Sequence, residues 1–325
     1  MAARPASEGH AATADETRRT VLLTVAYDGA AYAGFARQDN ATTVAEMLLR
    51  AIARFDPSVS ELRVASRTDA GVHARCNQVA FDTTRDLPPQ AWVRGMMPLL
   101  PDDVAVRAAA AVPQGFTPRF ASRGKRYRYV ILVDRCPDPQ WTKRAWRIWG
   151  LDEEAAALMS AELSVVAGTH DFSAFASSRD PRRHRRRTLT RPVVRWVDVA
   201  AGGPGSAPRV TVDIAGDGFL HHMVRILVGT AVDVGLGRRP PGTMATALAG
   251  RDRRRAGQTA PPYGLYLDDI TLAVQPFAQW PEARPTRGRE GHGTPPSIVV
   301  PGPSPASPSP LVRAPRTPPR PPPES

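Results

Sequence analysis

The sequence predicts an α+β fold built around a mainly antiparallel sheet. Segments with strand-like alternation and segments with helical periodicity are intermixed, and each half of the chain runs strand, helix, strands. The strict alternation of strand and helix that gives a doubly wound parallel sheet does not occur. The patterns GxGxxG, GxxxxGKS and GxxxxGKT are also missing, so nothing indicates a dinucleotide or triphosphate site.

Eight segments show the alternation and β-branched content typical of strands. The first ends in an Asp28-Gly29 turn, and a Gly-Gly-Pro-Gly-Ser stretch joins the sixth and seventh as an antiparallel pair. In chain order, the predicted strands cover residues 20–27, 62–65, 78–81, 104–112, 125–133, 192–200, 209–214 and 265–272.

Four segments repeat apolar residues at helical spacing. Pro89 suits the first turn of the second helix. Asp152 and two glutamates suit the positive N-terminal end of the third, and Gly168 lies just beyond its end. In chain order, the predicted helices cover residues 43–55, 89–97, 152–166 and 219–236.

Composition divides the chain into four parts. Residues 1–18 are rich in Ala, Thr and charge without periodicity, which predicts a disordered leader. Residues 281–325 are rich in Pro, Ser, Gly and Arg, which predicts a disordered tail. Between them we expect an N-terminal lobe over 19–122 and a C-terminal lobe over 123–280.

The charge balance predicts a polyanionic partner. The chain has 325 residues and carries 43 Lys and Arg against 31 Asp and Glu, a formal net charge of +12. A GC-rich genome explains the preference for Arg over Lys but not the excess over acidic residues, so nucleic acid is the expected partner. Two isolated cysteines, no signal-peptide core and no apolar run of ~20 residues predict a cytoplasmic protein with no disulfide and no membrane span.

Asp69 is the first candidate for chemistry. It follows a predicted short strand and precedes Ala70-Gly71, and Asp-X-Gly is also ordinary turn chemistry. Arg67 stands two residues earlier, so both side chains emerge on one face if the segment is extended. A neighbouring cation favours the ionised form of a carboxylate, which makes this pair a candidate catalytic site.

Arg225 is the second candidate. Apolar residues flank it on nearly every face of the predicted helix over 219–236, so it either reaches the rim or is buried against a partner. A buried guanidinium requires a carboxylate, because an unpaired buried charge costs several kcal/mol. The candidate partners are Asp69 and Asp217.

Basic and aromatic residues alternate in the strand predicted over 125–133. Tyr127 and Tyr129 share one face of that strand, and Arg126 and Arg128 share the other. Such interleaving suits a nucleic-acid surface, where a ring stacks on an unpaired base. A sheet edge with its tyrosines toward the core explains these residues equally well.

A run of basic residues over 182–187 is too self-repelling to pack on itself. We expect an exposed loop there, with Arg183, Arg185 and Arg186 along a phosphate backbone. Arg251 and Arg253 to Arg255 form a second cluster, which fits a solvated helix end equally well. The seven histidines form no recognisable metal-binding motif, so we expect no metal.

Six motifs follow one another in order over residues 20–275. They are Tyr27-Asp28-Gly29 with Tyr32 to Gln38, Arg67 to Ala74, Phe120 to Tyr129, His170 to Phe175, Phe219 to Arg225, and Thr259 to Leu267. These motifs resemble those of the TruA-type tRNA pseudouridine synthases, and the second, which contains Asp69, matches that family's catalytic motif almost letter for letter. Three residues depart from the family pattern: Ala36 replaces Gln, Ser66 replaces Gly and Ile226 replaces Asn.

The resemblance implies a pseudouridine synthase fold, in which two similar α/β lobes surround a basic cleft. It also implies that uridine is isomerised to pseudouridine at positions 38, 39 and 40 of the tRNA anticodon stem-loop, without a cofactor, by a homodimer. Asp69 would be the catalytic carboxylate, acting on C1′ or C6 or taking a sugar proton. The other residues implied in the site are Arg67, which displaces the uridine, Tyr127, which stacks on it, Arg225, which orients Asp69, and His73, which binds substrate.

Three alternative functions are compatible with the sequence. A tRNA-binding protein could keep the fold without turnover, although a pure binder needs no combination of Asp69, Tyr127 and Arg225. A related synthase could act on another uridine or another RNA. An aspartic-protease-like use of Asp69 needs a second carboxylate motif, which the chain lacks.

Overall fold

The computed structural model describes residues 18–198, 207–274 and 276–277. The predicted leader, apart from Arg18, lies outside them, as do the predicted tail and the Gly-Gly-Pro-Gly-Ser stretch.

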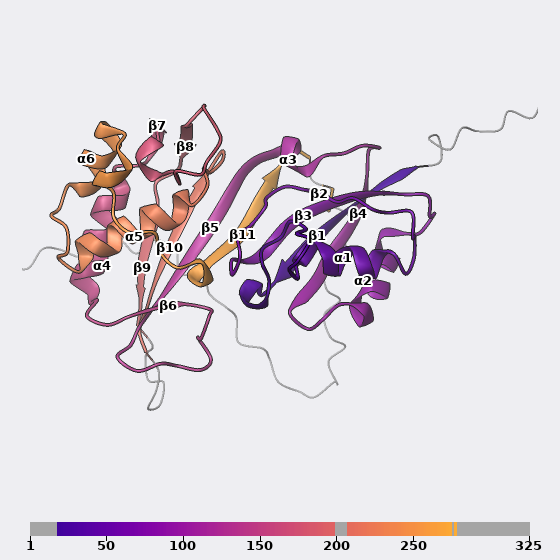
Figure 1. Cartoon of the computed structure of the whole chain (residues 1–325), viewed down its shortest axis with the longest axis horizontal. Coiled ribbons are helices and arrows are strands. Elements are labelled where there is room, and N and C mark those ends of the chain that lie inside the picture. The colour runs from indigo at the N-terminus through magenta and orange to yellow at the C-terminus, as the bar shows by residue number, and fades with distance from the viewer. Residues whose placement is uncertain (1–17, 199–206, 275, 278–325) are drawn as a thin grey trace, which may run out of the picture. The chain divides into compact units, whose positions relative to one another are not determined.

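One continuous sheet forms the framework of the described residues (Figure 1). Its main path runs β4-β1-β3-β11-β5-β10-β8-β7, while β2 pairs with β3, β6 with β5 and β9 with β10. All pairings are antiparallel except β3 with β11 and β5 with β6, which confirms the predicted fold class. The strands are β1 (Arg19–Tyr27), β2 (Arg63–Val64), β3 (His73–Thr83), β4 (Val104–Val112), β5 (Ser122–Val133), β6 (Trp146–Ile148), β7 (Gly168–Asp171), β8 (Arg186–Leu189), β9 (Val193–Val197), β10 (Arg209–Gly216) and β11 (Leu265–Leu272).

Helices cover one face of this sheet. Figure 1 shows α1 and α2 near β1 to β4 and α4 near β9, while α5 and α6 pack against α4. All four predicted helices are present, but the fourth begins at Met223 instead of residue 219, and α3 and α6 were not predicted. The helices are α1 (Val44–Ile52), α2 (Pro89–Met96), α3 (Pro118–Ala121), α4 (Glu153–Ser164), α5 (Met223–Gly235) and α6 (Thr243–Gly250).

Strand alternation decides which side chains meet the helices. In β5, Tyr127, Tyr129 and Ile131 are buried in the main core, while Arg126 and Arg128 point to the other face. A smaller apolar cluster on that other face contains Val130 and Leu132. Successive residues of a strand therefore point alternately to the face that the helices cover and to the opposite face of the sheet.

Two simpler predictions can also be compared with the structure. Cys76 and Cys136 are free thiols, as predicted. No helix in the described part of the chain is long and apolar enough to cross a bilayer. The predicted boundary between two lobes, after residue 122, falls at the first residue of β5 and stays a prediction.

Candidate active site

The loop between β2 and β3 carries Asp69 and is fixed by polar contacts. The Phe35 N–H donates to the Thr68 carbonyl at 3.1 Å, and the hydroxyls of Tyr27 and Thr68 lie 2.7 Å apart. Gly34 has φ +103°, and a Cβ there would lie 2.9 Å from the Thr68 carbonyl oxygen, so this close approach needs glycine. The loop is thereby anchored to β1 and to the segment before α1.

The Asp69 side chain lines a cleft of about 1490 Å³. Eight basic and three acidic side chains line it, so its electrostatic field favours an anionic ligand. The basic residues come from segments far apart in the sequence, which the sheet and α5 bring together. They are Arg37, Arg63, Arg67, Arg119, Lys125, Arg182, Arg187 and Arg225.

Arg225, in the first turn of α5, contacts Asp69 from the far side of the cleft. Its Nη1 lies 3.6 Å from Asp69 Oδ2, and its Nε donates to the Ala260 carbonyl at 2.7 Å. The side chain is only 13% exposed, and burial lowers its pKa. Of the two carboxylates that the sequence offered, Asp69 is thus the partner, because Asp217 instead accepts from the Thr188 N–H at 3.1 Å.

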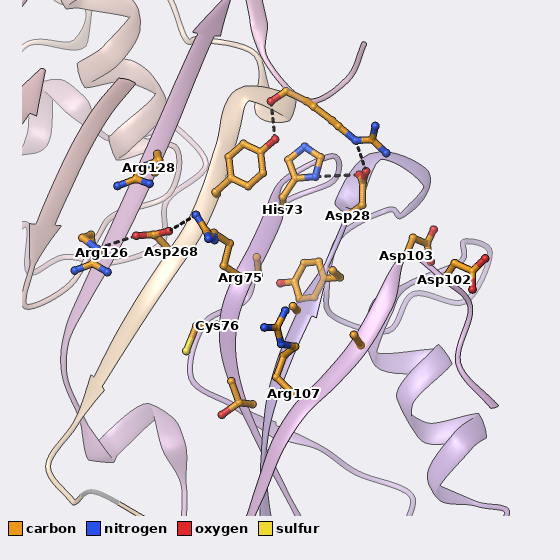
Figure 2. A pocket seen from close by; sticks show the side chains of 17 residues that line it. Asp28, His73, Arg75, Cys76, Asp102, Asp103, Arg107, Arg126, Arg128 and Asp268 are labelled. Atoms are coloured by element: carbon orange, nitrogen blue, oxygen red, sulfur yellow. Dashed lines mark hydrogen bonds and ion pairs between the residues drawn. The ribbon is translucent and has the colours of Figure 1, made fainter. Parts of the chain in front are cut away.

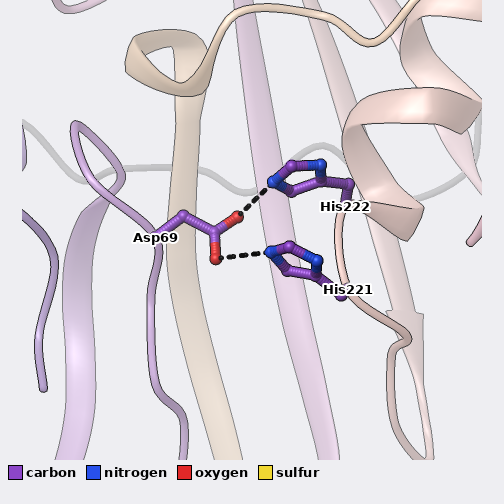
Figure 3. A group of neighbouring side chains, drawn as sticks. All are labelled: Asp69, His221 and His222. Carbon is purple, nitrogen blue, oxygen red and sulfur yellow. Dashed lines mark ion pairs between the residues drawn. The ribbon is translucent and has the colours of Figure 1, made fainter. Parts of the chain in front are cut away.

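Two histidines to which no role was assigned from the sequence also face Asp69 (Figure 3). His221 Nε2 lies 3.5 Å from Asp69 Oδ1, and His222 Nε2 lies 3.4 Å from Oδ2. His222 has φ +62°, a left-handed conformation that is costly for a residue with a Cβ. Burial, and secondarily Arg225, lower the pKa of His222, so the histidine beside the carboxylate favours its neutral form.

Tyr127 lies in β5 beneath the Asp69 loop. Its hydroxyl is 3.0 Å from Ser66 Oγ, and its ring meets Phe219 edge-on with centroids 5.0 Å apart. Burial raises the pKa of Tyr127 to about 12, so the phenol stays protonated at neutral pH. Ser66, one of the departures from the family pattern, therefore supplies a hydroxyl partner that glycine could not.

Arg67 lines the same cleft as Asp69, in keeping with a shared face. It is exposed, and no hydrogen bond or ion pair links its side chain to another residue that the structure describes. The guanidinium is therefore available to a ligand.

Arg126 and Arg128 do not reach this cleft. They lie on the opposite face of the sheet, where Figure 2 shows them with Asp268. Arg126 Nε is 2.9 Å from Asp268, and Arg128 Nε is 2.7 Å from Asp213. We therefore expect neither arginine to contact a uridine beside Asp69, and their contact with RNA outside the cleft stays a prediction. Alternation separates the two faces but does not say which of them is the site.

His73 is also on the side away from Asp69 (Figure 2). It is 2% exposed, its Nδ1 accepts from the Gly29 N–H at 3.0 Å, and its Nε2 lies within 3.0 Å of the Lys143 and Tyr263 carbonyls. The ring also stacks on Tyr266. His73 joins three backbone segments, and its side chain is not accessible to a substrate, contrary to its predicted role.

The basic run is split by the structure. Arg182 and Arg187 line the cleft, whereas Arg183, Arg185 and Arg186 do not. The run is also not wholly a loop, since β8 begins at Arg186. Contact of those three arginines with RNA outside the cleft stays a prediction.

Asp180 anchors this run and was not recognised in the sequence. Its carboxylate accepts from Arg182 Nε at 2.9 Å and Nη2 at 2.6 Å, and from the His221 N–H at 2.6 Å. These contacts hold its pKa well below the usual range, and hydrogen bonding from Arg182 is the largest cause. One buried carboxylate therefore ties the basic run to the histidines that face Asp69.

We expect Asp180→Asn to lower the free energy of unfolding by roughly 2–3 kcal/mol, because it weakens charge-assisted hydrogen bonds in a buried site. Urea denaturation at pH 7 measures this change. The pKa is depressed in the folded state, so the contribution is present above the unfolded pKa of about 4 and is lost as the pH falls through the folded pKa. Asp252→Asn is the control, since Asp252 pairs with Arg254 in similar i, i+2 geometry but is only half-buried, and its partner Arg254 is 90% exposed. Equal effects of the two substitutions would contradict the anchoring role.

Comparison with known proteins gives a consistent result. The model of a family described as tRNA pseudouridine synthase matches residues 23–121 and 165–271. A Myxococcus xanthus protein named tRNA pseudouridine synthase A is 40% identical over 260 residues, covering 80% of this chain and 94% of the relative. Proteins of the same name from Geobacter sp. M21 and Geobacter sulfurreducens are each 39% identical and cover 78% of this chain, with 98% and 99% of their own lengths matched.

Proposed function

The chain belongs to the tRNA pseudouridine synthase family, and from this premise we propose that it isomerises uridine at positions 38, 39 and 40 of the tRNA anticodon stem-loop, with Asp69 as the catalytic carboxylate. The observation that carries the proposal is Asp69 itself, which lies in a basic cleft and faces Arg225.

The reaction requires access to a glycosidic bond that is hidden in a stacked stem. The nucleotide must be flipped out, at a cost of a few kcal/mol. Phosphate contacts from the basic side chains of the cleft offset that cost. Arg67 is exposed beside Asp69 and free of protein partners, which supports a role in displacing the uridine.

The chemistry is balanced without an oxidant or reductant. The bond between N1 and C1′ breaks, a bond between C5 and C1′ forms, C5 loses a proton and N1 gains one. We therefore expect no cofactor. Each step open to Asp69, attack at C1′, attack at C6 or removal of a sugar proton, uses an ionised carboxylate, and the Arg225 guanidinium lies 3.6 Å from that carboxylate.

Tyr127 is suited to hold the base rather than to act as a strong base. Its pKa of about 12 leaves very little phenolate at neutral pH. Its ring lines the cleft and is braced edge-on by Phe219, which supports stacking on the flipped uracil.

The proposed function is tested by incubating the full chain with tRNA that carries 5-tritiated uridine. Tritium release shows turnover, and carbodiimide-blocked primer extension maps the product. Product at 38, 39 and 40 is expected. Product at another uridine would point to a related synthase of different specificity, and tRNA binding without any product would support a binding protein that lacks turnover.

Lys125 gives the cleft a pH-dependent charge. Burial is the main cause that lowers its pKa to about 8, with Arg119 and Arg182 adding to the shift, and its Nζ donates to the Ala65 carbonyl at 2.8 Å. Raising the pH from 7 to 9 removes this charge, so we expect tRNA affinity to fall roughly threefold to tenfold and the salt dependence to become shallower. Fluorescence anisotropy at several salt concentrations measures both.

Two lysine variants serve as controls for this prediction. Lys125→Arg keeps its charge to high pH and should bind equally at pH 7 and 9. Lys143→Gln changes the chain's only other lysine, which does not line the cleft, and should show the wild-type pH dependence. An unchanged pH dependence in Lys125→Arg would show that another group titrates.

We further propose a cytoplasmic homodimer that holds one tRNA. The tRNA substrate and two free thiols support the compartment. The sheet face opposite the Asp69 cleft supports self-association. Five arginines and four aspartates line a pocket on that face, and such mixed charge can be self-complementary. Light scattering that gives only the 35.1 kDa mass of one chain would contradict the dimer.

A further inference from the structure

Asp69, His221 and His222 form the only group of three potential metal ligands among the described residues whose ligand atoms all lie within 4.8 Å of one another. Figure 3 shows both imidazoles directed at the two oxygens of one carboxylate. The distances of 3.4 and 3.5 Å are too long for N–H···O hydrogen bonds, which span about 2.7–3.2 Å. Each is close to the roughly 3.3–3.5 Å between two ligands of a tetrahedral ion with bonds of about 2.0–2.2 Å. One ligand atom from each of the three residues can be chosen so that all three lie within 4.8 Å of one another.

The local backbone explains how two consecutive residues reach one point. Neighbouring side chains on an extended strand point to opposite sides. The left-handed conformation of His222 instead turns the chain, so the two rings lie next to each other, with centroids 3.8 Å apart and planes tilted by 33°. No hydrogen bond joins either imidazole to another residue that the structure describes, so the ring nitrogens are free to coordinate.

We propose that Asp69, His221 and His222 bind one divalent transition-metal ion of the Zn²⁺ class, and that this ion inhibits the enzyme by occupying the catalytic carboxylate. The inhibitory part rests on the proposed function, whereas metal binding does not. Two imidazole nitrogens and one carboxylate oxygen suit Zn²⁺ or Co²⁺, while Mg²⁺ and Ca²⁺ prefer oxygen ligands. Three protein ligands leave a fourth position for water.

Arg225 sets the character of this site. Its Nη1 is 3.6 Å from Asp69 Oδ2, so an ion on that carboxylate meets a nearby positive charge. The repulsion weakens metal binding and makes it readily reversible. An ion there inhibits because it occupies the carboxylate that the proposed isomerisation needs.

Metal binding is tested first without RNA, by titrating the full chain with CoCl₂ and recording visible absorption. We expect one equivalent of Co²⁺ with the intense bands of four-coordinate geometry, displaced by Zn²⁺. His222→Asn removes the ligand but keeps a residue that tolerates the left-handed conformation, and it should lose the bands. His170→Ala, whose ring instead contacts the Ala167 carbonyl, should retain them. No bands in the wild type, or equal bands in His222→Asn, would overturn the proposal.

Inhibition is tested separately by tritium release at increasing ZnCl₂. Zn²⁺ should inhibit the wild type, EDTA should restore activity, and inhibition of the residual activity of His222→Asn should need at least tenfold more Zn²⁺. Equal inhibition of both proteins would overturn the inhibitory role. Absence of turnover in metal-free wild type would instead contradict the proposed function, and the Co²⁺ result would stand independently.

Discussion

Asp69→Asn is expected to reduce pseudouridine formation by at least about 10³-fold while leaving tRNA affinity within a fewfold of wild type. The amide keeps the size of the side chain but removes the charge that each candidate step requires. The basic side chains that line the cleft are unchanged, so phosphate binding should persist. Single-turnover tritium release measures the chemical step, and filter binding measures affinity.

Asp217→Asn is the matched control for this experiment. It removes a negative charge from the same cleft without touching Arg225, because Asp217 accepts from the Thr188 N–H instead. Its activity should stay within a fewfold of wild type. Full activity in Asp69→Asn would remove Asp69 from the mechanism, and equal losses in both variants would indicate a general electrostatic effect.

Gly229→Ala is expected to lower the free energy of unfolding by roughly 3 kcal/mol and to impair turnover. Gly229 lies within α5, and a Cβ there would be 2.1 Å from the Gln258 carbonyl oxygen. The helix and the segment over 257–260 must then separate. That segment positions Arg225, since the Ala260 N–H donates to the Arg225 carbonyl and the Ala260 carbonyl accepts from Arg225 Nε.

Gly250→Ala is the control for that substitution. Gly250 ends α6, and the nearest atoms to a new Cβ belong to the flexible Arg255 side chain at 3.1–3.3 Å. We expect unchanged stability or a small gain, because alanine favours the helix over glycine. Urea denaturation of both variants compares them. Wild-type stability in Gly229→Ala would contradict the close packing of α5 against 257–260.

Local patterns predicted most of the fold. Alternation over 125–133 predicted β5 and the separation of its tyrosines from its arginines, because one face of a strand must be buried. Asp152 predicted the start of α4 and accepts from the Ala155 N–H at 2.8 Å. The short strands β6, β7 and β8 were missed, since three or four residues contain too little alternation to recognise.

The site was predictable only where chemistry constrains a single residue. A largely apolar helix predicted that Arg225 needs a carboxylate, but choosing Asp69 over Asp217 depends on tertiary packing. The histidine pair could not be foreseen, because a positive φ is uncommon outside glycine and no local pattern marks it at His222. Arg126 was predicted to bind RNA because alternation does not show which face of a sheet carries the site. In the structure Arg126 pairs with Asp268.

The position of β11 determines the order in which this enzyme can be completed during translation. This strand, formed by Leu265–Leu272, lies in the middle of the sheet and joins β3 to β5, pairing Tyr266 with His73 on one side. Until β11 emerges from the ribosome, the strands that flank its position in the sheet form two separate sets. Each set has an exposed edge, and such edges favour aggregation. Pairing across so long a sequence separation is slow. A nascent chain therefore carries Asp69, Tyr127 and Arg225, the side chains proposed for catalysis, before the sheet that positions them is complete.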